Sequence, residues 1–207
     1  MPQHSSQPSG LSQAGSLELD RICEPPDSEG LDRRIRKTRQ RLQAGLLLLM
    51  KEKPMGQITM REVCRTADVG RSTPYTHYRD VEDILEQMEA ALYNGLASLL
   101  AQYPAQGTPA GREAWFTLFY TLARRNGLLL EVLLCHGGDA AFLSRCMALC
   151  EGQIQSAVAG SGPESEWHAS FLCGALTSLL RQWVRGGCAE PPAQMAAMTV
   201  GFLGRLG

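Results

Sequence analysis

Residues 59–78, TMREVCRTADVGRSTPYTHY, predict two short helices joined by a tight turn. Thr59 and Glu62 have the spacing of a capping box, in which the threonine side chain accepts a hydrogen bond from the Glu62 amide and the Glu62 side chain reaches back to Thr59. The helix that begins there is expected to bury Val63, Cys64 and Ala67. The turn is expected at residues 68–70, where Gly70 can take a positive φ or cap the next helix. A brief helical segment from Arg71 to Tyr78 would complete a helix-turn-helix.

A longer helix is predicted upstream of this segment, because apolar residues recur at helical spacing from about Leu31 onward. Its apolar face carries Ile35, Leu42, Leu46 and Leu49, and Pro54 and Gly56 end it. The first turns are crowded with cations: Arg33, Arg34, Arg36, Lys37, Arg39 and Arg41.

Basic residues are concentrated in this part of the chain. The 207 residues include 20 Lys and Arg against 21 Asp and Glu, which gives a formal net charge of −1. Residues 33–80 contain twelve basic and four acidic residues, whereas residues 1–32 contain one and six, and residues 81–207 contain seven and eleven. A segment with a net charge of +8 inside a nearly neutral chain indicates an anionic partner for that segment.

The composition favours an all-α fold. Leucine occurs 29 times and alanine 22 times, against 12 valines and isoleucines together. No stretch reaches about 20 mainly apolar residues, and the N-terminus MPQHSSQPSG has no apolar signal core, so we expect neither a membrane partner nor secretion. The seven cysteines are irregularly spaced, which fits reduced thiols in the cytoplasm. No nucleophile–base pair, metal motif or phosphate loop is visible, so we expect neither an enzyme nor a cofactor.

Three parts are predicted along the chain. Residues 1–30 are rich in Ser, Gln, Pro, Gly and acidic residues and are expected to be a disordered leader, with a short contacting arm as the alternative. Residues 31–80 are expected to form the helix-turn-helix domain and residues 81–207 a helical body. Helices are predicted in the body at 81 to about 103, 112–125, 127–135, 139–160, 164–186 and 190–206.

The run from residue 59 to residue 78 resembles the DNA-binding signature of the TetR family of bacterial repressors. The residues that carry the likeness are Ala67 and Val69, the alternation of Thr73, Tyr75 and His77, and then Tyr78 and Asp80. The resemblance covers roughly residues 32–90. It implies an all-α protein in which three N-terminal helices bind DNA and the remaining helices form a ligand-binding and dimerising body.

By this resemblance, residues 71–77 lie in the major groove, which is wide enough for a helix and presents a distinct pattern for each base pair. The residues expected to contact DNA are Thr59, Arg71, Ser72, Thr73, Tyr75, Thr76, His77 and Arg79. Arg71 can fork onto guanine or a phosphate, and Thr59 presents a hydroxyl at the N-terminus of a helix. The cations of residues 33–41 would add attraction to phosphate that is independent of sequence.

Two residues depart from the family pattern. Pro74 stands where the family usually has Leu or Phe, and it removes one amide at a position where proline costs least if it lies in the first turn of a helix. Val81 stands where the family commonly has a phosphate-binding lysine, and Arg79 is the candidate replacement. Core packing is the alternative role for Tyr75, Tyr78 and His77, and a solvated helix face is the alternative for the arginines.

The body resembles regulators related to the dihydroxyacetone kinase operon activator, in the runs 125–129, 138–139, 142–143, 171–176, 183–184 and 187–188. Its last two helices suit a four-helix bundle across a two-fold axis, through Leu172, Gly174, Ala175, Leu176, Leu179, Leu180, Ala196, Ala197, Val200 and Leu203. A small-molecule effector is expected in an apolar pocket, for which the candidate lining residues are Trp115, Phe116, Phe119, Tyr120, His136 and Trp167.

The sequence therefore predicts a homodimeric regulator that binds double-stranded DNA at an inverted-repeat operator and is released by an effector, as a repressor. The alternatives are an activator of the same fold and a helical protein-interaction module without operator affinity, which would lack steep salt dependence. Cys146 and Cys150, with Cys135-His136 upstream, form a candidate metal or redox site, but their apolar surroundings favour packed cysteines.

Overall fold

The computed structural model describes residues 33–70, 73–103, 108–157 and 163–206, so the predicted leader lies outside the described residues. The described part contains helices and no strands, which confirms the prediction of an all-α fold. The elements in chain order are α2 (Arg33–Met50), η2 (Met55–Gln57), α3 (Met60–Ala67), η3 (Pro74–Thr76), α4 (Val81–Leu100), α5 (Pro109–Arg125), α6 (Gly127–Cys135), α7 (Ala140–Ala157), α8 (Pro163–Arg185) and α9 (Pro192–Leu206).

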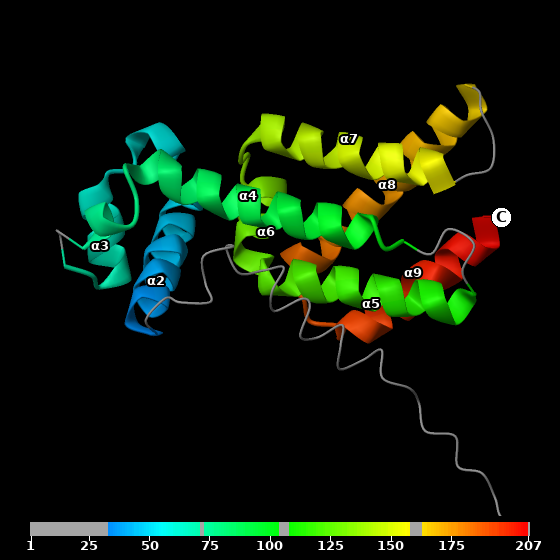
Figure 1. The fold of residues 1–207 in the computed structure, drawn as a ribbon, viewed down its shortest axis with the longest axis horizontal. Helices are drawn as coiled ribbons and strands as arrows, with labels where there is room; N and C mark the ends of the chain where they lie inside the picture. The colour runs from blue at the N-terminus through cyan, green and yellow to red at the C-terminus, as the bar shows by residue number, and fades with distance from the viewer. Residues whose placement is uncertain (1–32, 71–72, 104–107, 158–162, 207) are drawn as a thin grey trace, which may run out of the picture.

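The helices form two groups that α4 connects (Figure 1). We call α2, α3, η3 and the first turn of α4 the head, and the rest of α4 with α5–α9 the body. The core of the head consists of Leu42, Leu46, Leu49, Ile58, Met60, Val63, Cys64, Ala67, Tyr78, Val81 and Ile84. Because Val81 and Ile84 belong to this core, the predicted boundary after residue 80 falls at the start of a helix that both parts share.

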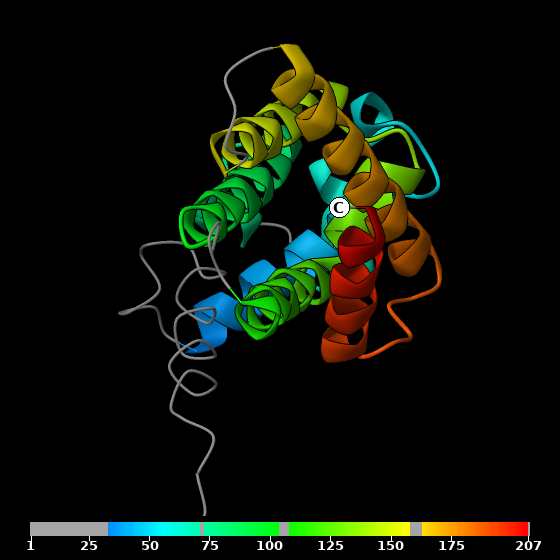
Figure 2. The same ribbon diagram turned by 90° about the vertical axis from the view of Figure 1, so that its right-hand side faces the viewer.

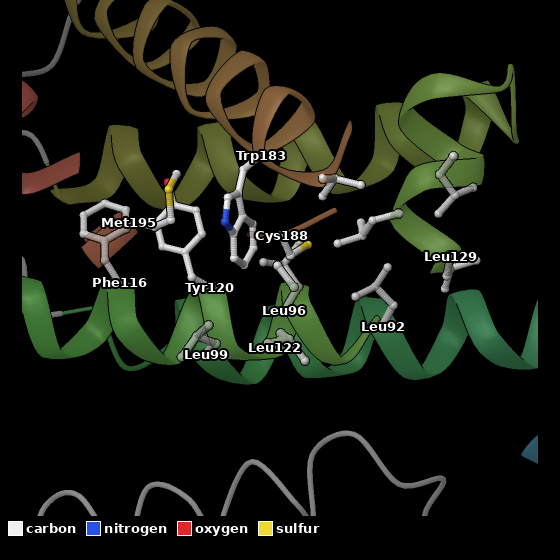
Figure 3. Close-up of a cluster of buried hydrophobic side chains, with 14 of the residues drawn as sticks. Leu92, Leu96, Leu99, Phe116, Tyr120, Leu122, Leu129, Trp183, Cys188 and Met195 are labelled. Atoms are coloured by element: carbon white, nitrogen blue, oxygen red, sulfur yellow. The ribbon is translucent and has the colours of Figure 1, made fainter. Parts of the chain in front are cut away.

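The body helices are arranged around a common centre, as the end-on view shows (Figure 2). Their buried side chains form one apolar core there. Tyr120 of α5 and Trp183 of α8 meet there edge to face, with ring centroids 5.2 Å apart (Figure 3). The buried Tyr120 hydroxyl hydrogen-bonds with Thr199 Oγ1 of α9 at 2.8 Å, and Trp115 Nε1 donates to the Leu99 carbonyl at 2.8 Å. These bonds satisfy the polar atoms that large aromatic side chains bring into an apolar core.

A close contact between α2 and α3 and a left-handed residue at the end of α3 shape the helix-turn-helix. An added Cβ on Gly45 of α2 would lie 3.2 Å from both Ala67 Cβ and the Val63 carbonyl oxygen, so glycine permits the contact between α2 and α3. Asp68 ends α3 in the left-handed region, with φ 53° and ψ 52°, and its amide donates to the Arg65 carbonyl. The positive φ that was one of two roles considered for Gly70 is found at Asp68, a residue type that enters this region more readily than most.

The predicted helical segment from Arg71 to Tyr78 is wrong in extent. Residues 71–72 lie outside the described residues, and over 73–78 the structure has only the 3₁₀ turn η3. Pro74 has no amide hydrogen for the α-helical bond to the Gly70 carbonyl, which instead accepts from the Thr73 amide at 3.1 Å. The fully buried Pro74 ring takes a core position in the head.

Over the described residues, no single helix is long and apolar enough to cross a membrane. One pair bent by 106°, Gly127–Cys135 with Ala140–Ser156, meets the length and composition test jointly.

Replacing Gly45 with valine is expected to lower the free energy of unfolding by about 1–3 kcal/mol, because the added methyl groups must enter the contact between α2 and α3. Gly152→Val in α7 is the matched control, since an added Cβ there meets nothing within 4 Å. Urea unfolding followed by circular dichroism measures both variants. Equal unfolding midpoints would contradict a packing role for Gly45.

Candidate nucleic-acid interface and effector cavity

The predicted capping box at the start of α3 is present. The Thr59 hydroxyl accepts from the Glu62 amide at 3.3 Å, and the Thr59 amide donates to Glu62 Oε2 at 3.0 Å. Lys53 Nζ lies 2.7 Å from Glu62 Oε1, and this bond, with those to Thr59, lowers the pKa of Glu62 to about 2. The Thr59 hydroxyl also donates to Glu62 Oε2 at 2.9 Å. A phosphate contact from this hydroxyl would therefore require it to exchange an ionised carboxylate for another acceptor.

Tyr75 projects from the head. Its side chain is 65% exposed, although it belongs to a turn whose neighbours Pro74 and Tyr78 are buried. Thr76 is also exposed, and its hydroxyl donates to the Thr73 carbonyl at 2.7 Å. Thr73 and His77 are half-buried, and the predicted contact residues Arg71 and Ser72 lie outside the described residues. The described residues of this turn thus present an aromatic ring and a hydroxyl to solvent.

His77 is partly withdrawn into the head. Its ring packs edge to face against Tyr78, with centroids 6.5 Å apart. Desolvation and the nearby positive charge of Arg39 lower the pKa of His77 below its usual value. At neutral pH the imidazole is therefore uncharged, and it offers a neutral N–H donor rather than a cation.

Tyr78 is a core aromatic, one of the two roles considered for it. Its buried ring has the Arg39 guanidinium 5.6 Å from the centroid, and its hydroxyl accepts from Gln43 Nε2 at 3.2 Å and Arg39 Nε at 3.4 Å. Arg39 Nη2 also donates to Gln87 Oε1 of α4 at 2.7 Å. Arg39 therefore joins α2, the turn and α4, unlike Arg33, Lys37 and Arg41, whose side chains are exposed.

Arg79 lies beside the acidic start of α4. Its guanidinium is 76% exposed but has Asp83 Oδ1 at 3.1 Å and Glu86 Oε2 at 3.4 Å. The Arg79 amide donates to Asp83 Oδ2 at 2.9 Å, and this bond is the main cause of the lowered pKa of Asp83. Val81, at the position where the resemblance led us to expect a lysine, is buried. Arg79 can replace that lysine at a phosphate only in competition with two carboxylates.

The body contains an apolar cavity of about 350 Å³. Of the predicted lining residues, Trp115, Phe116 and Phe119 of α5 do line it. Tyr120 is instead part of the core beside it, His136 is exposed, and Trp167 is 76% exposed. Leu92, Leu96 and Leu100 of α4 form another wall, so the helix that enters the head also borders the cavity.

Three cysteines line the same cavity: Cys146, Cys150 and Cys173. Burial raises the pKa of Cys146 to about 11, and a hydrogen bond from the Cys150 thiol to Cys173 raises the pKa of Cys150. Cys135 is only half-buried, and His136 Nε2 has Glu131 Oε1 at 3.7 Å. Over the described ranges, no group of three His, Cys, Asp or Glu side chains is placed to hold a metal ion.

No family model and no curated protein matches the chain, but solved structures do. A TetR-family transcriptional regulator from Streptomyces coelicolor is 19% identical, with a TM-score of 0.57 over 80% of this chain and 78% of that one. The dihydroxyacetone kinase operon activator DhaS is 16% identical, with a TM-score of 0.51 over 80% and 93%. FadR from Bacillus subtilis, in complex with stearoyl-CoA, is 12% identical, with a TM-score of 0.52 over 79% and 96%.

The chain has the TetR fold. At identities of 12–19% the likeness establishes the architecture, and it agrees with the family that residues 59–78 indicated. Each of these structures is described as a regulator or an operon activator.

Sequence reasoning missed several residues that the TetR fold brings together. Gln43 and Gln87 meet Arg39 and Tyr78 from two helices, which no local spacing indicates. Arg112 lines the cavity. Its helix begins at Pro109 rather than at residue 112, because the Thr108 hydroxyl caps α5 by accepting from the Gly111 amide at 3.1 Å. Thr108 followed by proline is the start signal that was available.

Arg39→Ala is expected to lower the free energy of unfolding of the head by about 1–3 kcal/mol, because it removes charge-assisted hydrogen bonds and a cation–π contact. Arg41→Ala removes the same charge from an exposed position of the same helix, and we expect a change within about 0.5 kcal/mol. Thermal and urea unfolding measure both variants. Equal effects on stability would show that Arg39 is an ordinary surface cation.

Proposed function

We propose that this protein is a DNA-binding transcriptional regulator that acts as a homodimer on an inverted-repeat operator, and that an effector bound in the body releases it from DNA. The observation that carries the proposal is the outward Tyr75 on a small, well-packed head whose segment has a net charge of +8. Folding gains nothing from leaving this large ring exposed, whereas a groove with stacked bases and phosphates offers it a partner.

The proposed DNA surface consists of the turn and the exposed cations of α2. Thr73, Tyr75, Thr76 and His77 would contact the major groove and its phosphates, together with Arg71 and Ser72, which lie outside the described residues. Arg33, Lys37 and Arg41 would attract the backbone regardless of sequence. Thr59 and Arg79 remain candidates, and we assign them smaller contributions because each already contacts a carboxylate.

A second copy of the chain is the proposed partner of α8 and α9. Phe171 and Phe202 are 59% and 45% exposed, and both belong to these helices. Gly174, Ala175 and Ala197 are also exposed, as close approach across a two-fold axis requires. Ala196 was also expected at the interface, but it is fully buried within its own chain and cannot contact a second copy. Apolar faces of this kind lose free energy in water unless another surface covers them.

The proposed control by the effector works through α4. Leu92, Leu96 and Leu100 border the cavity, while Val81 and Ile84 lie in the core of the head. Lys51, just after α2, has its Nζ 2.7 Å from Glu131 Oε1 of α6, which makes a further link between the head and the body. A ligand that prefers a cavity with displaced α4 would favour dimers whose heads no longer match the half-site spacing.

The direction of regulation follows from which conformer the ligand prefers. DhaS is described as an operon activator, and FadR is described in complex with stearoyl-CoA. An activator with the same DNA surface is therefore the second candidate. It would bind DNA more tightly with its effector, whereas the proposed repressor would bind DNA less tightly.

Tyr75→Ala is expected to weaken binding to a selected operator duplex by about tenfold or more, because a base-edge contact contributes about 1–3 kcal/mol. Arg41→Gln is expected to reduce the salt slope of log K by about one without changing sequence preference. Arg124→Gln, at an exposed position of α5 in the body, is the charge control. Fluorescence anisotropy across salt, on a duplex obtained by selection from random sequences, measures all three.

One result would contradict the proposed function. A wild-type protein that shows no affinity for any duplex at low salt would exclude the operator-binding role. It would favour the helical protein-interaction module instead, since that module has no reason to show salt-dependent binding to DNA.

Phe202→Glu is expected to raise the dimer dissociation constant by about a hundredfold or more, because the two-fold axis places the buried charge in the interface twice. Sedimentation velocity should find wild-type protein at twice the chain mass of 22.6 kDa and the variant largely at that mass. Ala148→Glu adds the same charge at an exposed position of α7 and should leave the dimer intact. A dimer that both variants retain would place the interface elsewhere.

A further inference from the structure

The cavity in the body is apolar but carries positive charge. Leucine, aromatic, methionine and cysteine side chains from α4 to α9 form most of its wall. Its described lining includes two arginines, Arg112 of α5 and Arg181 of α8, and no aspartate or glutamate. Glu89 and Glu151 act on the lining cysteines but are not themselves lining residues, so the charged groups that line this apolar wall are positive and favour an anion.

Arg112 is the residue that this potential depends on most. It lies in the first turns of α5, and its Nε atom is buried without a hydrogen-bond partner in the described part of the chain. Arg181, by contrast, is exposed. A buried donor of a charged group that lacks an acceptor costs more free energy than an ordinary unmade hydrogen bond. An oxygen acceptor on a bound ligand would pair with this donor.

The volume limits what can supply that acceptor. About 350 Å³ lies near the lower end of the range of about 300–1,000 Å³ for small-molecule sites. The guanidinium is a planar fork that matches two oxygen atoms of a carboxylate or similar oxyacid. Apart from the arginines, the polar groups on the wall are few, chiefly Gln153, Thr177 and the three thiols. A ligand with many hydroxyl groups would lose hydration here without replacing it.

We infer that the cavity binds a compact, mainly apolar ligand with one oxyanion group, which pairs with the guanidinium of Arg112. The inference rests on the proposed function, because it names the chemical class of the effector. A neutral ligand of the same shape offers Arg112 Nε at most an uncharged acceptor, which leaves the charge of the guanidinium unpaired. A cationic ligand meets like charge. The cavity thus selects an apolar anion over both.

A pair of fluorescent dyes that differ by one group tests the inference on the full-length protein. Anilinonaphthalene sulfonate carries an oxyanion on the same aromatic skeleton as the neutral phenylnaphthylamine. We expect the wild type to bind the sulfonate at least about tenfold more tightly than the neutral dye, because only the sulfonate can form a charge-assisted hydrogen bond with Arg112. Octanoate should displace the bound dye at lower concentration than octanol does.

Three variants separate charge from shape. Arg112→Gln should abolish the preference for the sulfonate while leaving the affinity for the neutral dye within about twofold, which also shows that the cavity is intact. Arg112→Lys should keep part of the preference, because the charge stays but the fork is lost. Arg124→Gln, an exposed position on the same helix, is the matched control and should behave as wild type.

Two outcomes would overturn the inference. One is a wild type that binds the two dyes equally, and the other is a preference for the sulfonate that survives in Arg112→Gln, as a dye on the apolar α8–α9 face would show. Failure here is distinguishable from failure of the proposed function, because operator binding is measured without any ligand. A protein that binds DNA but lacks the dye preference loses only this inference.

Discussion

Helix α4 is packed into two hydrophobic cores along its length, α2 adds Leu47 to the core of the body, and the rest of the molecule is arranged around that constraint. Its first turn contributes Val81 and Ile84 to the core of the head, while Leu92, Leu96 and Leu99 belong to the core of the body. Leu85 and Met88 pack against both cores. Packed interiors resist gradual deformation. A shift of α4 beside the cavity would therefore displace the packed side chains of the head as well.

In the head, residues of the same type have different environments and contacts. Arg39 is used internally, where it holds the Tyr78 ring and hydroxyl and reaches Gln87 on α4. Arg41, two residues along the same helix, is exposed. The capping box likewise engages the Thr59 hydroxyl with Glu62. A donor that already has a charged acceptor must exchange partners to bind phosphate, so the proposed DNA surface depends mainly on the outward turn and the exposed cations.

The cavity combines an apolar wall with a buried charged donor, and these two features favour different groups of a ligand. Its apolar wall gains from filling with hydrocarbon, whereas the buried donor of Arg112 gains only from an acceptor. An amphiphilic anion satisfies both at once, and it would do so against the same face of α4 that leads to the head. Ligand chemistry and the proposed control of DNA binding therefore meet at one helix.

The sequence by itself determined the helical class, most helix positions and the capping box, because hydrophobic spacing and cap residues act over a few neighbours. It also indicated the TetR fold through residues 59–78, and the solved structures agree with that fold at identities of 12–19%. Other features depended on contacts between distant segments. The shortening of the Arg71–Tyr78 helix followed from Pro74 in its packed setting, and the left-handed residue proved to be Asp68 rather than Gly70.

Only the tertiary structure decided which cations are internal, which aromatic rings are exposed and which arginine enters the cavity. The sequence alone does not distinguish the environment of Arg39 from that of Arg41, or that of Arg112 from that of Arg124. Their burial and partners are set by helices that lie far away in sequence, such as Gln87 of α4 for Arg39. Local spacing predicts the face of a helix, but what covers that face is fixed by long-range packing.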